Sequence, residues 1–260
     1  MGTQPILLIQ TGSAPDDILA PHGDLDHWFQ QALGPSAADG GSQAPNLAPV
    51  QVVRVFAGEA LPAPGRHRVA IITGSWAMVT DRLGWSEATA AWIREAMRID
   101  MPLFGVCYGH QLMAHALGGT VDYHPAGIEI GCLPVERLPA GADDPLAATL
   151  PERFPVHLTH MQSVLVPPPG AQVLARSAQD AHQMLRYGPK AVSTQFHPEF
   201  TPAITAACIT RREAQLRDEG HDPDALLARL SDTAVARGLL RDFVTTHAGL
   251  APTPVARVAS

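Results

Sequence analysis

Features that mark several protein classes are scarce in this sequence. Its 260 residues include only three cysteines, Cys107, Cys132 and Cys208, which form no C-x-x-C pair and have no spacing suited to zinc ligands. An odd number of thiols without a signal peptide favours a reducing, cytoplasmic location. We therefore expect no metal site in this chain.

Long apolar runs and clusters of basic residues are also missing. No apolar stretch approaches the roughly 20 residues of a membrane span, so no contact with a membrane is expected. The net charge is −7 and the basic residues are scattered singly, which argues against a groove for nucleic acid. Aromatic residues make up only 5% of the chain, and this scarcity favours a helix-covered parallel sheet over an aromatic-rich β-sandwich.

The order of the predicted elements indicates an α/β fold. In the first half of the chain, short apolar runs typical of buried strands alternate with segments of helical spacing. The predicted strands are 6–10, 52–56, 69–72 and 102–106, and the predicted helices are 24–33, 86–98 with Ser86 as N-cap, and 111–117. Such repeats predict a mostly parallel central sheet covered by helices on both faces.

After Thr120 the pattern changes to period-two alternation with proline-bearing turns. The predicted strands here are 128–135, 154–158, 173–175 and 191–196, and the predicted helices are 203–218 and 223–246. The segment 35–49 is rich in Gly, Ser, Asn and Pro, which is typical of a surface loop rather than a linker. We predict a single domain over residues 1–250 and a frayed tail over residues 251–260.

The strongest chemical signal surrounds Cys107. A predicted strand leads into this residue, a glycine lies two residues away on each side, and a helix follows, as in a G-x-C-x-G nucleophile elbow. At the start of a helix, free N–H groups and the helix dipole stabilise negative charge, and the Tyr108 N–H is a predicted oxyanion donor. The alternative is a small buried hydrophobic cysteine, which the flanking glycines and elements disfavour.

A cysteine nucleophile needs a base, and the base needs a group that orients it. His197 ends an apolar strand, Pro198 stops that strand, and Glu199 follows within reach of the imidazole. A surface histidine before a proline turn is the alternative, and the elbow at Cys107 makes it less favoured. Gly74 follows another buried strand and is a candidate second oxyanion donor, with a plain turn residue as the alternative.

With these pieces the sequence resembles the class I (triad-type) glutamine amidotransferases, in particular the stand-alone, GMP-synthase-like glutaminase branch. The resemblance rests on residues 10–12, 73–81, 103–119, 127–131, 159–163 and 195–200. It implies a flavodoxin-like fold and cleavage of the glutamine amide through a cysteine thioester, with release of ammonia. No metal or organic cofactor is implied. Many family members have Gly-Gly-Pro where this chain has Thr-Gly-Ser at residues 73–75.

The resemblance also assigns expected roles to single residues. Cys107 is the expected nucleophile, His197 the base and Glu199 the third member of the triad, while Gly74 and Tyr108 supply backbone donors. The expected substrate contacts are Gln111, His160 and Gln162, although a loop role without chemistry is equally compatible with the sequence around His157 and His160.

Three functions remain open at this level. The first is a glutaminase that passes ammonia to a separate acceptor synthase, and the second is a free-standing γ-glutamyl hydrolase or peptidase. Both act on a small molecule through the same cysteine, base and oxyanion donors. The third is a binding protein with an idle triad, for which the Thr-Gly-Ser segment is the only support.

Overall fold

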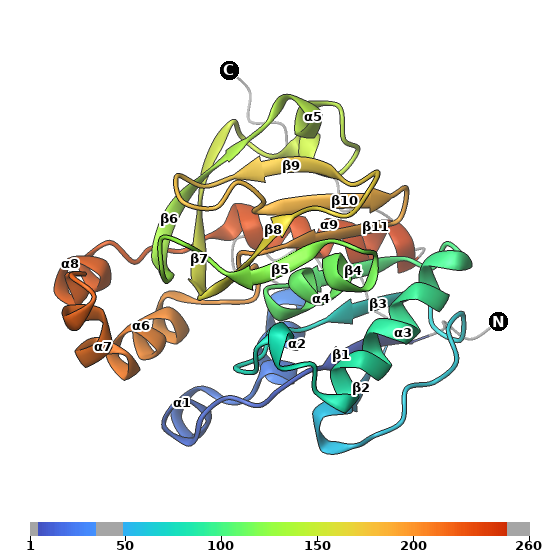
Figure 1. Cartoon of the computed structure of the whole chain (residues 1–260), viewed down its shortest axis with the longest axis horizontal. Coiled ribbons are helices and arrows are strands. Elements are labelled where there is room, and N and C mark those ends of the chain that lie inside the picture. Colours follow the sequence, from blue (N-terminus) through green and yellow to red (C-terminus); the bar gives the residue numbers. More distant parts are fainter. Residues whose placement is uncertain (1–4, 35–48, 249–260) are drawn as a thin grey trace.

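The computed structural model describes residues 5–34 and 49–248. Within them a nine-stranded central sheet is flanked by helices on both faces (Figure 1). The strands are β1 (Ile6–Gln10), β2 (Val50–Arg54), β3 (Val69–Ile72), β4 (Leu103–Val106), β5 (Thr120–Tyr123), β6 (Glu129–Arg137), β7 (Arg153–His160), β8 (Gln162–Val166), β9 (Gln172–Arg176), β10 (Met184–Gly188) and β11 (Ala191–Thr194). The α-helices are α1 (Asp16–His22), α2 (Leu25–Leu33), α3 (Gly84–Arg98), α4 (Tyr108–Ala116), α5 (Pro139–Ala142), α6 (Pro202–Arg211), α7 (Glu213–Asp218), α8 (Pro223–Ala228) and α9 (Ala234–Ala248).

The central sheet has a parallel half and an antiparallel half. Its strand order is β2-β1-β3-β4-β11-β10-β9-β6-β7, and the first five strands in this order pair in parallel. The last four strands extend the sheet by antiparallel pairing, while β5 and β8 form a separate two-stranded sheet. The predicted α/β class, with helices on both faces and a single domain, is confirmed.

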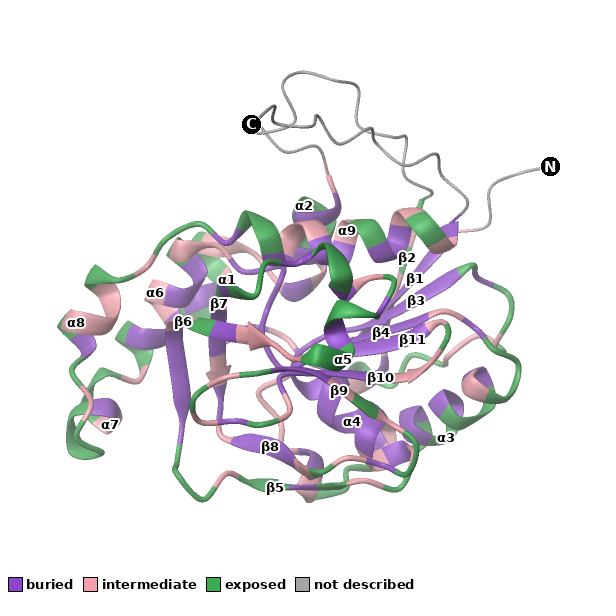
Figure 2. Ribbon diagram, turned by 90° about the horizontal axis from the view of Figure 1, so that it is seen from above, coloured by how far each residue is buried: buried purple, intermediate pink, exposed green. Residues whose placement is uncertain are grey.

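Both faces of the parallel half are buried, and the side chains of each strand alternate between two apolar clusters. In β1, Ile6 and Leu8 join the cluster that contains residues of α2 and α9, whereas Leu7 and Ile9 join the cluster of α3 and α4. The inner strands are accordingly buried along their length (Figure 2). Burial on both faces explains why these strands are continuous apolar runs in the sequence.

Several element boundaries differ from the sequence-based expectation. The strand predicted at 52–56 ends at Arg54, because residues 55–57 form a 3-10 turn that leads into the left-handed Gly58. Helix α3 begins at Gly84, so Ser86 is not its N-cap; the buried Ser86 hydroxyl instead lies 2.6 Å from the Tyr108 hydroxyl.

The single helix predicted over residues 223–246 is two helices, α8 and α9. Leu226 and Leu227 of α8 pack against Ile128 and Ile209, whereas α9 packs into the main core under the sheet. The chain must therefore turn between the two clusters, which breaks the helix. The tail predicted at 251–260 and most of the loop predicted at 35–49 lie outside the described residues.

Helix α4 approaches β3 and β4 closely at two glycines. A Cβ atom on Gly109 would lie 2.3 Å from the Ile72 carbonyl oxygen, and a Cβ on Gly105 would lie 2.6 Å from the Gly109 oxygen. The Gly109 N–H donates to the Thr73 carbonyl at 3.0 Å. These positions therefore accept only glycine without movement of the backbone. In the described part of the chain, no helix is long and apolar enough to cross a membrane.

We expect Gly109→Ala to lower the free energy of unfolding by about 1–3 kcal/mol, because the added methyl group forces α4 away from β3. Gly238→Ala is the matched control, since a Cβ at this position in α9 meets no atom within 4 Å. This control should keep the wild-type stability or gain up to about 1 kcal/mol. Urea denaturation followed by circular dichroism measures both, and wild-type stability of Gly109→Ala would contradict the close packing.

Candidate active site

Cys107 occupies the corner between β4 and α4. Its backbone has φ 50° and ψ −100°, an uncommon conformation for a residue with a side chain. The Cys107 N–H donates to the Thr194 carbonyl of β11 at 2.8 Å, and its own carbonyl accepts from the Gln111 N–H at 3.0 Å. These bonds hold the thiol at the carboxyl edge of the parallel strands, where sites in open α/β sheets lie.

His197 and Glu199 follow β11 at the same edge. The His197 Nδ1 atom lies 2.7 Å from Glu199 Oε1, and both side chains are buried. The imidazole also stacks on the Phe200 ring, with centroids 3.9 Å apart. The His197 N–H donates to the His157 carbonyl at 2.9 Å, which ties this turn to β7. Because Nδ1 is occupied, the ring presents Nε2, a buried atom without a hydrogen-bond partner among the described residues.

Cys107 and His197 are neighbours across Gly74. A Cβ atom on Gly74 would lie 3.1 Å from His197 Cε1 and 3.7 Å from Cys107 Cβ. Both side chains line one cleft, and the Cys107 sulfur also lies 4.0 Å from the Thr159 carbonyl oxygen. The structure thus brings together the cysteine, the histidine and the carboxylate that the sequence analysis selected.

The surroundings of His197 favour its charged form. Burial alone would lower the pKa of His197, but the charge of Glu199 and then that of Cys107 raise that pKa to about 10. The pKa of the adjacent His157 is shifted in the opposite direction, because burial and the charge of His197 lower it to about 4. Of these two neighbouring imidazoles, therefore, His197 carries the positive charge at neutral pH.

The peptide between Thr73 and Gly74 is held in one orientation. The Thr73 carbonyl accepts from the Gly109 N–H at 3.0 Å and from the Thr11 hydroxyl at 3.1 Å. The Gly74 carbonyl accepts from the Thr11 and Thr73 hydroxyls at 2.7 and 2.9 Å. Among the described residues, neither the Gly74 N–H nor the Tyr108 N–H has an acceptor, so both remain available to a ligand.

Gln111 and Gln162 both line the cleft, and their amides have different surroundings. Gln111 Nε2 donates to the Gln162 carbonyl at 2.6 Å and to Gln195 Oε1 at 3.0 Å. Both polar atoms of the Gln162 amide have partners within the protein, because Oε1 accepts from the Val79 N–H and Nε2 donates to the Thr80 hydroxyl. Gln111 Oε1 is therefore the amide atom of this pair that is open to a ligand.

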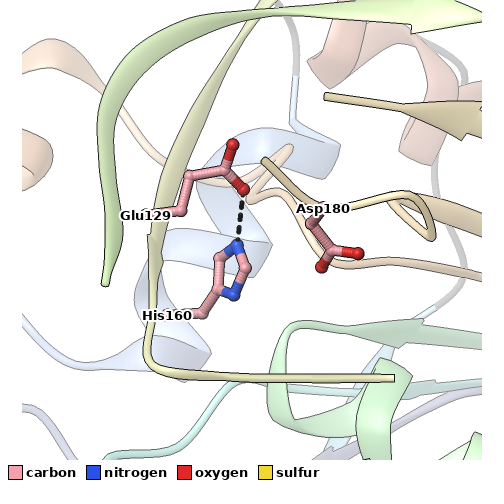
Figure 3. Close-up of side chains that lie close together, drawn as sticks. All are labelled: Glu129, His160 and Asp180. Carbon is pink, nitrogen blue, oxygen red and sulfur yellow. Dashed lines mark hydrogen bonds and ion pairs between the residues drawn. The ribbon is translucent and has the colours of Figure 1, made fainter. Parts of the chain in front are cut away.

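His160 lines the cleft, but both of its ring nitrogens have partners inside the protein. Nε2 is 2.9 Å from Glu129 Oε2 (Figure 3). Nδ1 is 3.0 Å from the Gln162 carbonyl oxygen. Both ring nitrogens are thus engaged by β6 and β8. Its expected substrate contact remains a prediction.

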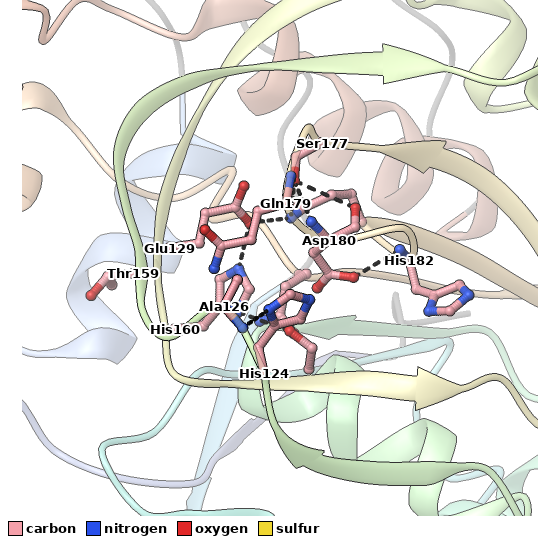
Figure 4. A network of polar contacts seen from close by, with 12 residues as sticks. His124, Ala126, Glu129, Thr159, His160, Ser177, Gln179, Asp180 and His182 are labelled. Carbon is pink, nitrogen blue, oxygen red and sulfur yellow. Dashed lines mark hydrogen bonds and ion pairs between the residues drawn. The ribbon is translucent and has the colours of Figure 1, made fainter.

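Glu129, His160 and Asp180 form a group of possible metal ligands, with ligand atoms within 4.8 Å of one another. Asp180 belongs to a turn in which its N–H donates to the Ser177 hydroxyl and its carboxylate accepts from the His182 N–H (Figure 4). Glu129 already binds His160 and also accepts from Gln183 Nε2. The group forms a buried polar network that connects β6, β7 and the turn before β10.

The sequence analysis missed several residues that line the cleft. The missed lining residues include Trp76, Met78, Met161, Phe200 and Arg212. Four of them are apolar, and their type alone suggests ordinary packing. Arg212 lies at the end of a helix, so no local pattern indicates that it faces a site built by other elements.

Comparisons with known proteins point to one family. A family model described as "Glutamine amidotransferase class-I" matches residues 68–214. A GMP synthase [glutamine-hydrolyzing] from Thermomicrobium roseum is 39% identical over 122 residues, which cover 46% of this chain and 21% of that protein. A GMP synthase [glutamine-hydrolyzing] subunit from Halobacterium salinarum is 38% identical over 84 residues, 32% of this chain and 44% of that relative. The match thus spans less than half the length of either relative.

Solved structures support the fold. A glutamine amidotransferase from Thermotoga maritima superposes with a TM-score of 0.71 at 22% identity, covering 94% of this chain and 98% of that one. A glutamine amido transferase from Methylobacillus flagellatus has a TM-score of 0.65 at 22% identity, with 95% and 94% of the two chains covered.

We expect Glu199→Gln to slow alkylation of Cys107 by iodoacetamide at neutral pH by about tenfold. Without the carboxylate, burial dominates and the pKa of His197 falls, so less imidazolium is present to stabilise a thiolate. As the pH rises, the imidazolium should be lost at a lower pH in the variant than in the wild type.

Mass spectrometry of the Cys107 peptide against time and pH gives these rates. Glu136→Gln is the control, because Glu136 forms an exposed ion pair with Arg176 at 3.0 Å in another part of the sheet. Unchanged alkylation of Glu199→Gln at all pH values would show that the carboxylate does not set the charge of His197.

Proposed function

The chain belongs to the class I glutamine amidotransferase family, whose reaction is hydrolysis of the glutamine side-chain amide with release of ammonia, and we propose that Cys107, His197 and Glu199 perform it here. The observation that carries this proposal is the shared cleft of a strained cysteine and a carboxylate-bound imidazole. A strained cysteine and an oriented base are the two parts that acyl transfer to sulfur requires.

The first half of the reaction forms a thioester. The Cys107 sulfur attacks the amide carbon, and the carbonyl oxygen gains negative charge in a tetrahedral intermediate. The free N–H groups of Gly74 and Tyr108 are suited to accept this charge. As the C–N bond breaks, the His197 imidazolium donates its proton from Nε2 to the departing nitrogen, which leaves as ammonia.

The second half consumes one water molecule. Neutral His197 removes a proton from water, the oxygen attacks the thioester, and a second tetrahedral intermediate forms in the same oxyanion site. Collapse releases glutamate and restores the sulfur and the imidazolium. Glu199 keeps Nδ1 engaged throughout, so that Nε2 is the atom that transfers the proton in both halves.

The Thr-Gly-Ser segment is compatible with this role. The hydroxyls of Thr11 and Thr73 fix the peptide planes on both sides of Gly74, because they bind the carbonyls of Thr73 and Gly74. The Ser75 hydroxyl donates to the Thr11 carbonyl at 2.8 Å, which further restrains this segment against the loop after β1. Preorganised donors lower the cost of stabilising an oxyanion, since they need not reorient during the reaction.

We further propose that a separate synthase consumes the ammonia. The support is the name of the Halobacterium relative, which describes one subunit of a glutamine-hydrolysing GMP synthase, an enzyme whose parts are therefore separate chains. The small-molecule substrate of the present chain is then glutamine, and the partner is an enzyme that adds ammonia to an acceptor.

We expect the wild-type protein to release glutamate from glutamine. Cys107→Ala should do so at least about a thousandfold more slowly, because the thioester cannot form. Cys132→Ala is the matched control, since Cys132 is a partly exposed free cysteine outside the cleft. Coupled oxidation of the released glutamate measures the rate, and acid quenching followed by mass spectrometry detects the acyl group on Cys107.

The same assay should include a γ-glutamyl dipeptide. Cleavage of the dipeptide but not of glutamine would replace the proposed glutaminase with a γ-glutamyl peptidase that uses the same triad. No acyl group on Cys107 with any of these substrates would contradict the thioester mechanism itself.

A further inference from the structure

Arg212 is a charged residue of the cleft that the proposed mechanism does not use. It lies at the junction of α6 and α7, and it lines the same cleft as Cys107 and His197. Its Nη1 atom lies 3.7 Å from the sulfur of Met161, another lining residue. The side chain is half-buried, so part of its charge is already removed from bulk water.

Within the described residues, the guanidinium of Arg212 has no carboxylate partner. Among the described residues, no Asp or Glu oxygen lies within 4.0 Å of it, and the lining of the cleft includes neither residue type. The neighbouring arginines differ in this respect. Arg211 pairs with Asp17 at 2.5 Å, and Arg217 pairs with Glu213 at 2.9 Å. The cleft thus presents a positive charge that no carboxylate of the described residues neutralises.

A γ-glutamyl substrate carries the matching group. Its amide must lie at Cys107, and its other end bears an α-carboxylate and an α-ammonium group. A planar guanidinium binds a carboxylate through two parallel N–H···O bonds, which makes arginine well suited to this group. The ammonium group needs neutral acceptors in a cleft without acidic residues, and Gln111 Oε1 and the Thr159 carbonyl are of that kind.

We infer that Arg212 binds the α-carboxylate of the γ-glutamyl substrate and so determines which amides the cleft accepts. This inference rests on the proposed function, because it assumes that the amide carbon lies at Cys107. An amide whose far end lacks a carboxylate leaves the guanidinium without a partner and binds less tightly. Since the contact lies far from the reacting bond, its loss should raise KM more than it lowers kcat.

The test uses Cys107→Ala as a binding form that cannot turn over substrate. We expect calorimetric titration with L-glutamine to show a roughly 10–100-fold weaker Kd after Arg212→Met is added, the range for a charge-assisted hydrogen bond. The Kd with Arg212→Lys should lie between the Kd of the parent form and the Kd with Arg212→Met, because an ammonium group keeps the charge but cannot make two parallel hydrogen bonds. Arg211→Met is the matched control, since Arg211 pairs with Asp17 at the surface. The variant with Arg211→Met should bind glutamine as tightly as the parent form does.

L-Glutamine methyl ester serves as the probe in which the carboxylate is masked. It should bind the parent form roughly 10–100-fold more weakly than glutamine does, and Arg212→Met should remove most of that difference. Equal weakening of both ligands by Arg212→Met, or an equal effect of Arg211→Met, would overturn the inference. Thermal unfolding of each variant shows whether a lost affinity reflects a lost fold.

Turnover by the protein with Cys107 intact separates this inference from the proposed function. Glutamine hydrolysis together with Arg212-independent binding would overturn the role of Arg212 and leave the function in place. Arg212-dependent binding without any hydrolysis would contradict the function and support the carboxylate contact. Absence of glutamine binding to Cys107→Ala would overturn both.

Discussion

The parallel pairing of β4 with β11 brings the two chemical segments of this chain to the same edge of the sheet. Val106 lies opposite Thr194, and the Cys107 N–H continues the ladder by donating to the Thr194 carbonyl. The nucleophile and the base are 90 residues apart in the sequence, yet Cys107 directly follows β4 and His197 lies three residues beyond the end of β11. If β11 were shifted by one residue against β4, the side chains of β11 would point to the opposite face of the sheet. The remaining features of the site depend on this register, because they orient groups that the sheet has already brought together.

A layer of buried amides and imidazoles lies behind the cleft and fixes its walls. Gln111 on α4 binds the Gln162 carbonyl, and the same carbonyl accepts from His160, whose other nitrogen meets Glu129. Each of these polar groups is buried, so each needs a hydrogen-bond partner. The resulting hydrogen bonds join α4, β6 and β8. The polar layer therefore connects the antiparallel half of the sheet to the helix that carries the nucleophile. It does so without using the atoms that face the cleft.

The local patterns of the sequence predict the elements whose signals are strong. The buried strand at Ile6–Gln10 and the elbow around Cys107 agree with the structure because burial on both faces and close helix packing leave clear local traces. The break between α8 and α9 leaves no such trace, since it depends on two separate apolar clusters. Arg212 escapes prediction for a related reason. The role that we propose for it rests on the absence of a nearby carboxylate among the described residues, which only the assembled chain reveals.

The segment that forms the rim of the cleft is anchored at both of its ends. At one end Thr11 holds the carbonyls of Thr73 and Gly74, and at the other the Gln162 amide binds Val79 and Thr80. Only residues 75–78 lie between these anchors, and the Ser75 hydroxyl restrains the first of them. A bulkier leaving group would therefore have to be accommodated by rotation of the Trp76 and Met78 side chains, because the backbone of the rim has little freedom to retreat.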